Sequence, residues 1–80
     1  MSKTEKLLAK FKMTNGQFKW VELVTLLKSL GFEQIEGAGS RVCFTNGDIN
    51  IRLHKPHPHK EVKAYVVAQV KDTLIKEGLL

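Results

Sequence analysis

Apolar residues recur at helical spacing in two long stretches of the chain. From Trp20 they fall at i, i+3, i+4 and i+7, and Gly31 follows as a stop signal, which predicts a helix over residues 19–30. A second stretch over residues 63–77 has the same spacing and ends at Gly78. Both helices therefore have one apolar face to bury.

A narrower apolar stripe lies near the N-terminus. Leu7, Leu8 and Phe11 predict a first helix that ends at about Lys12, before the helix-breaking pair Asn15-Gly16. Because this stripe is narrow, we expect the helix to dock on the domain rather than to form its centre.

After Gly31 the period of the pattern changes to two. Alternation predicts strands over residues 32–36, 41–45 and 49–54, separated by the loop 37–40 and a turn that contains Asn46-Gly47. Antiparallel strands bracketed by helices indicate an α+β fold: a two-layer sandwich whose three-stranded antiparallel sheet has helices on one face, in the order α-α-β-β-β-α.

The second and third strands form a hairpin with two possible registers. A type I′ turn at Asn46-Gly47 pairs Arg41 with Arg52, whereas a turn centred one residue later pairs Arg41 with His54. Both registers have the same parity, so they predict the same two faces. The residues expected in the core are Val42, Phe44, Ile49, Ile51 and Leu53. The residues expected on the outer face are Arg41, Cys43, Asn50, Arg52 and His54.

The chain has 80 residues, enough for one hydrophobic core. We expect a single domain over residues 1–80, in which residues 1–16 add an N-terminal helix and turn to a core of residues 17–80. No apolar run approaches the roughly 20 residues of a membrane span, and the N-terminus does not resemble a secretory signal. These features favour a cytoplasmic protein without a membrane partner.

Positive charge is in local excess over residues 41–63. The formal net charge is +5, and residues 41–63 contain five Lys or Arg residues against two acidic ones. Such a surface favours an anionic partner such as RNA, because guanidinium groups bind phosphate in a bidentate manner. The alternative is a solvated sheet face shielded by long side chains.

Histidines lie on or beside the predicted cationic face. RNA cleavage needs no metal where side chains transfer the protons and cations stabilise the transition state, and His54 and His57 are suitable for that transfer. His57 lies between two prolines, so an alternative role is to rigidify the loop. With a single cysteine and no helical histidine pair, we expect neither a metal site nor a cofactor.

Three segments together resemble the HicA family of bacterial toxins. They are residues 20–32, which end in Leu-Gly-Phe, Gly39-Ser40-Arg41-Val42, and residues 53–58, followed by a last helix that ends in Glu-Gly-Leu-Leu. The resemblance implies a double-stranded-RNA-binding-domain-like fold, endonucleolytic cleavage of mRNA, and neutralisation by a HicB-type antitoxin.

One position departs from the family pattern. The family commonly has its catalytic histidine directly after Gly-Ser, where this chain has Arg41, and a guanidinium stays protonated and cannot act as a general base. We therefore expect the proton transfer from His54, or secondly from His57. The predicted RNA-binding residues are Arg41, Arg52, Lys55 and Lys60. The alternative is a non-catalytic RNA- or protein-binding module of the same fold.

Overall fold

A computed structural model describes residues 3–14, 16–56 and 60–80. Its elements, in chain order, are α1 (Lys3–Met13), β1 (Phe18–Lys19), α2 (Trp20–Ser29), β2 (Glu33–Glu36), β3 (Arg41–Thr45), β4 (Asn50–His54), β5 (Glu61–Val62) and α3 (Ala64–Lys76). All three predicted helices and all three predicted strands are present, with ends that differ from the predictions by at most one residue.

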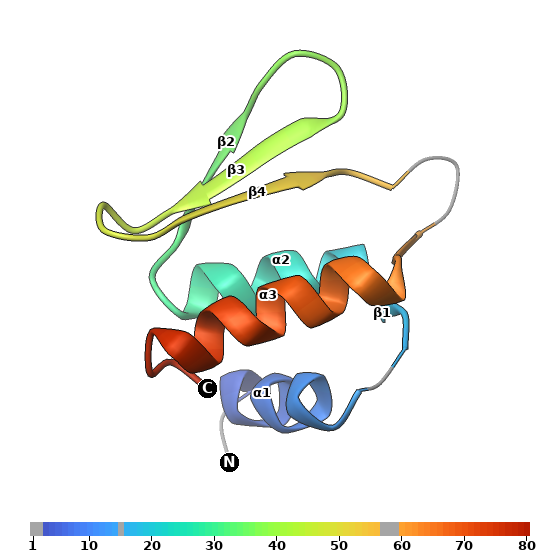
Figure 1. Cartoon of the computed structure of the whole chain (residues 1–80), viewed down its shortest axis with the longest axis vertical. Coiled ribbons are helices and arrows are strands. Elements are labelled where there is room, and N and C mark those ends of the chain that lie inside the picture. Colours follow the sequence, from blue (N-terminus) through green and yellow to red (C-terminus); the bar gives the residue numbers. More distant parts are fainter. Residues whose placement is uncertain (1–2, 15, 57–59) are drawn as a thin grey trace.

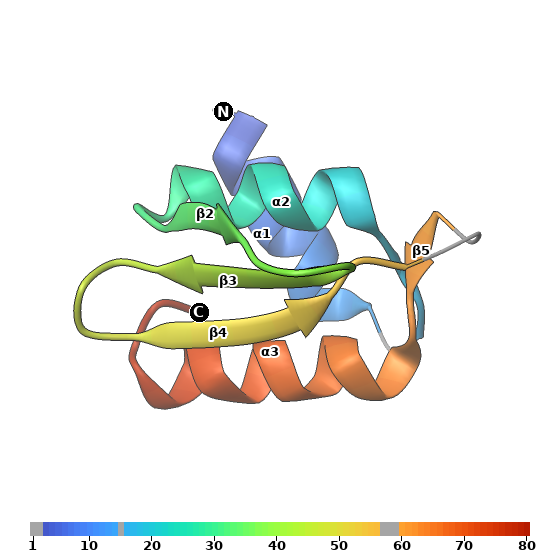
Figure 2. The ribbon, with the colours of Figure 1, turned by 90° about the horizontal axis from the view of Figure 1, so that it is seen from above.

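The main sheet is antiparallel, with the strand order β2-β3-β4. Helices α2 and α3 lie side by side against one face of this sheet, and α1 lies on the side of these helices that is away from the sheet (Figures 1 and 2). The predicted α+β sandwich is confirmed. No helix formed by the described residues covers the opposite face of the sheet in either view.

The core lies between the sheet and the helices. Helix α2 contributes Leu23, Leu26 and Leu27, all fully buried, and α3 contributes Val67, Val70 and Leu74. The sheet contributes Val42, Phe44, Ile51 and Leu53, while Ile49 is partly buried against the cluster. This alternation along β3 and β4 is the one predicted, and it leaves the other face exposed.

A second, two-stranded sheet was not predicted. Phe18 of β1 pairs with Val62 of β5, and the amide of Trp20 donates a hydrogen bond of 3.0 Å to the carbonyl of Lys60. This bond satisfies one of the free N–H groups at the start of α2, where Lys19 provides no side-chain cap. The pairing therefore joins the start of α2 to the segment before α3.

The hairpin adopts the second of the two predicted registers. Thr45 pairs with Asn50 and Arg41 with His54, so the turn is centred on Gly47-Asp48. A type I′ turn at Asn46-Gly47 requires a positive φ at both residues. Gly47 has a positive φ of 99°, but Asn46 does not, so this turn does not form. The side chain of Asn46 instead accepts hydrogen bonds from the amides of Asp48 and Ile49, which stabilises this turn.

Gly47→Ala is expected to lower the free energy of unfolding by about 1–2 kcal/mol, because an L side chain is strained at this φ. The matched control is Asp48→Ala in the same turn, where φ is not positive and the side chain is exposed. The control should change stability by less than about 0.5 kcal/mol. Urea unfolding of both variants measures the difference, and equal effects would contradict the assigned turn.

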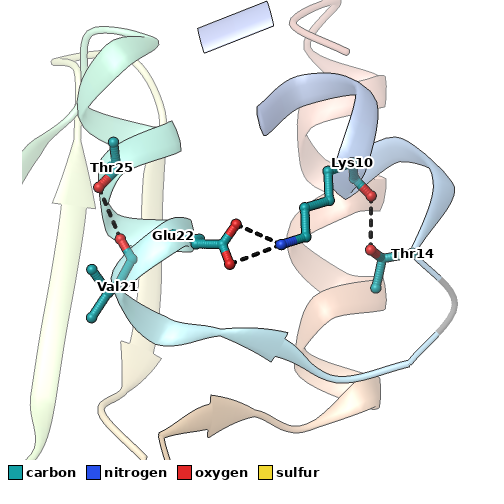
Figure 3. Close-up of polar contacts among 5 residues, drawn as sticks. All are labelled: Lys10, Thr14, Val21, Glu22 and Thr25. Atoms are coloured by element: carbon teal, nitrogen blue, oxygen red, sulfur yellow. Dashed lines mark hydrogen bonds and ion pairs between the residues drawn. The ribbon is translucent and has the colours of Figure 1, made fainter. Parts of the chain in front are cut away.

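Helix α1 reaches further into the domain than its narrow stripe indicated. Phe11 is fully buried, and its ring lies 5.1 Å from that of Phe18 in an edge-to-face arrangement. Lys10 forms an ion pair of 2.8 Å with Glu22 of α2 (Figure 3). Lys71 of α3 donates to the carbonyl of Thr14, just beyond the C-terminal end of α1, where a cation also complements the helix dipole.

Candidate nucleic-acid interface

The outer face of the sheet is built from three rows of paired residues, and two of these rows carry the cationic side chains. The pairing places Ile35, Cys43 and Arg52 in one row across the three strands. Arg41 and His54 form the next row, extended by Gly37, whose amide donates to the Arg41 carbonyl at 2.8 Å. Arg41, Arg52 and His54 are exposed, so these side chains are available to a ligand.

Arg41 and His54 occupy the closer of the two kinds of antiparallel pair. The Lys55 amide donates to the Ser40 carbonyl at 2.7 Å, so residues 40 and 55 form a hydrogen-bonded pair. Hydrogen-bonded and non-hydrogen-bonded pairs alternate along the hairpin from there. Arg41 and His54 therefore form a non-hydrogen-bonded pair, in which the Cα atoms are about 4.5 Å apart and the side chains lie closest. The same holds for Cys43 and Arg52.

The hydroxyl of Ser40 lies beside the imidazole of His54. Its Oγ is 3.5 Å from Nδ1, at the long end of the hydrogen-bond range. This contact leaves Nε2, the other ring nitrogen, available to a ligand on the outer face. Ser40 was not predicted as a site residue. The hairpin register alone, however, places it opposite Lys55, which is the residue that follows His54.

An open depression lies over the two rows that contain Arg41 and Arg52. Its lining includes Ile35, Gly37, Arg41, Cys43, Arg52 and His54. Gly37 has no side chain to cover the guanidinium next to it, and a Cβ there would lie 3.4 Å from the Cβ of Arg41. Ile35 is 51% exposed, so it adds an apolar surface to the lining beside the cationic side chains.

The charge on this face is polarised. The cationic end carries Arg41, Arg52 and His54, whereas Glu33 lies in the row at the other end, paired with Thr45. Among the described residues, no carboxylate lies within salt-bridge distance of Arg41 or Arg52. The two guanidinium groups are therefore free to bind an anion.

The structure brings together four of the six predicted site residues. Arg41, Arg52 and His54 share the outer face, and Lys55 follows His54 directly at the end of β4 and is exposed. Lys60 is also exposed but lies before β5. Its carbonyl accepts the hydrogen bond from the Trp20 amide at the start of α2. The sixth residue, His57, lies outside the described residues.

Neither a metal centre nor a membrane segment is found in the part of the chain that the structure describes. No three His, Cys, Asp or Glu side chains gather there in a way that could hold a metal ion. No helix in that part combines the length and the apolar character that a membrane-spanning segment needs.

Comparison with known proteins identifies the family. A family model described as the HicA toxin of bacterial toxin–antitoxin systems matches residues 20–78, from the start of α2 to just beyond α3. A search of curated proteins and a search of solved structures each found no significant match. The family match covers most of the chain and includes all three strands of the main sheet, so the chain belongs to the HicA family of toxins from bacterial toxin–antitoxin systems.

Proposed function

We propose that this toxin binds and cleaves mRNA in the cytoplasm on the outer face of its sheet, and that a HicB-type antitoxin neutralises it. The observation that carries the proposal is the direct cross-strand pairing of Arg41 with His54 on an exposed face where no described carboxylate neutralises the arginine. A phosphate diester fits this arrangement, because the guanidinium binds its oxygens while the imidazole reaches the adjacent ribose.

The reaction consistent with these groups is transfer of the phosphoryl group to the neighbouring 2′-hydroxyl. His54 takes the proton of the 2′-hydroxyl as its oxygen attacks phosphorus, and the bond from phosphorus to the 5′-oxygen breaks. Arg41 and Arg52 stabilise the negative charge that develops on the non-bridging oxygens. A second group, for which His57 is the candidate, donates a proton to the leaving 5′-oxygen. The products are a 2′,3′-cyclic phosphate and a 5′-hydroxyl.

The arginine after Gly39-Ser40 is compatible with this reaction. Position 41 and position 54 are directly opposite on neighbouring strands, so an imidazole at position 54 projects from the same part of the face as one at position 41. His54 thus replaces the family histidine, and Arg41 adds a charge for phosphate. Arg41 also favours the alternative function, an RNA- or protein-binding module of the same fold that does not cleave.

Incubation of the purified protein with single-stranded RNA in the presence of EDTA tests cleavage. We expect fragments that end in a 2′,3′-cyclic phosphate, since the proposed chemistry uses no metal. Growth arrest on expression, relieved by co-expression of a HicB-type antitoxin, is the matching result in cells. Intact RNA that nevertheless binds the protein would favour the non-catalytic module.

Arg41→Ala and Arg52→Ala are each expected to weaken RNA binding and to reduce its dependence on salt. Each lost phosphate contact to a single strand should lower the slope of log K against log salt by about 0.7. The control is Lys6→Ala, which removes the same charge from α1, on the side of the helices away from the sheet (Figure 1). Fluorescence anisotropy over a salt series measures the slopes, and an equal change in all three variants would exclude this face as the RNA site.

A further inference from the structure

A second depression lies on the other side of β4, between the end of this strand and the start of α3. Arg52 and His54 line it as they line the first one, so the two depressions meet at β4. Its opposite wall includes Tyr65 and Gln69 of α3. Tyr65 is 63% exposed, which excludes it from the core and leaves its ring open to a ligand.

The edge of β4 adds backbone groups to this depression. β4 is an outer strand of the sheet, and its hydrogen-bonded pairs with β3 use the residues that alternate with Arg52 and His54. The N–H and C=O groups of Arg52 and His54 therefore point away from β3, and among the described residues they have no partner. Such groups can bind the polar edge of a nucleotide base.

The wall formed by α3 is also suited to an anion. Lys63 is the N-cap of α3, no side chain caps the helix there, and its first turn has no acidic residue. The positive end of the helix dipole is therefore not offset by an acidic residue within the first turn. Arg52, Lys55 and Lys63 line the depression against a single carboxylate, that of Glu61.

We propose that this depression binds the single-stranded RNA next to the cleaved phosphate, with one base stacked on the ring of Tyr65. The inference rests on the proposed function, because it continues the RNA path from the outer face across the edge of β4. An exposed aromatic ring flanked by cations is the arrangement by which proteins hold unpaired bases. A peptide strand added to the β4 edge would use the same backbone groups, but the excess of positive charge favours a phosphate backbone.

The test uses the full chain and a fluorescein-labelled single-stranded RNA made non-cleavable by 2′-O-methyl groups. Tyr65→Ala is expected to weaken binding roughly 5- to 100-fold, as the loss of one stacked base would. Tyr65→Phe keeps the ring and should bind almost as tightly as the wild type. Neither variant should change the salt slope, since no phosphate contact is removed, whereas Lys63→Ala should lower it by about 0.7.

Stacking itself is detected with 2-aminopurine placed in turn at each position of the same RNA. One position should lose fluorescence on binding the wild type or Tyr65→Phe, and this quenching should be absent with Tyr65→Ala. If Arg41→Ala weakens binding and Tyr65→Ala does not, the depression is not an RNA subsite, while the proposed function stands. If the wild type binds no RNA, both proposals fail. If Tyr65→Ala weakens binding of an antitoxin peptide only, the depression serves a protein, and the RNA subsite is excluded.

Discussion

His54→Ala is expected to lower the rate of RNA cleavage by roughly 10²–10⁴-fold, the usual contribution of one general acid–base group. The reason is positional, because His54 is the histidine that the described structure places on the outer face, directly opposite Arg41. Single-turnover cleavage of a short labelled RNA measures the chemical step separately from product release. RNA affinity should change little, since Arg41 and Arg52 remain.

The control for this variant is Ser40→Ala, which removes the hydroxyl 3.5 Å from the imidazole and keeps the imidazole itself. It should cost far less activity than His54→Ala, because an exposed contact of this length orients the ring only weakly. Undiminished cleavage by His54→Ala would exclude His54 as the proton-transfer group. His57→Ala, assayed in parallel, tests the second candidate, and an equal loss would assign it the proton of the leaving oxygen.

Phe11→Ala is expected to lower the free energy of unfolding by about 3–5 kcal/mol, the usual cost of truncating a fully buried phenylalanine. A domain of this size has a total stability of roughly 4–12 kcal/mol, so the loss is a large fraction of it. The variant also loses the edge-to-face contact with Phe18 and the contact of the Lys71 ammonium, 5.8 Å from the ring centroid. Urea unfolding followed by circular dichroism measures the change.

Met13→Ala on the same helix is the matched control. Met13 is 81% exposed, and the substitution should change stability by less than about 0.5 kcal/mol. If Phe11→Ala is as mild as Met13→Ala, then α1 is a detachable addition rather than part of the core. A severe loss would show that the N-terminal helix is needed for folding, even though the family match begins only at residue 20.

The sequence was sufficient to predict α2, α3, β3 and β4 because each of them buries one continuous face. Trp20 to Leu30 and the alternation in β3 and β4 have strong periodicity, and burial follows it. The pairing of Phe18 with Val62 was missed, since strands of two residues have no period to detect. The depth of Phe11 was underestimated because a narrow stripe does not reveal that two other helices leave room for a ring.

The sequence predicted which residues share the outer face, but it did not predict which of them lie directly opposite one another. Parity alone placed Arg41, Arg52 and His54 outward, whereas the register depended on which turn Asn46 stabilises. Its side-chain hydrogen bonds to the following amides decide between two turns that fit the strand pattern equally well. The exposure of Tyr65 was also undetermined, because an aromatic residue near a helix start can face the core or the solvent with the same local sequence.

The most direct test of the proposed RNA site is to titrate the ¹⁵N-labelled protein with the non-cleavable RNA and follow its amide resonances. Shifts should concentrate at Arg41, Cys43 and residues 52–55, and α1 should stay unchanged, because it lies on the side of the helices away from the sheet (Figure 1). Shifts confined to α1 or to the Glu33 end of the sheet, with Arg41 and His54 unaffected, would contradict the assignment of the cationic face as the site where this toxin binds RNA.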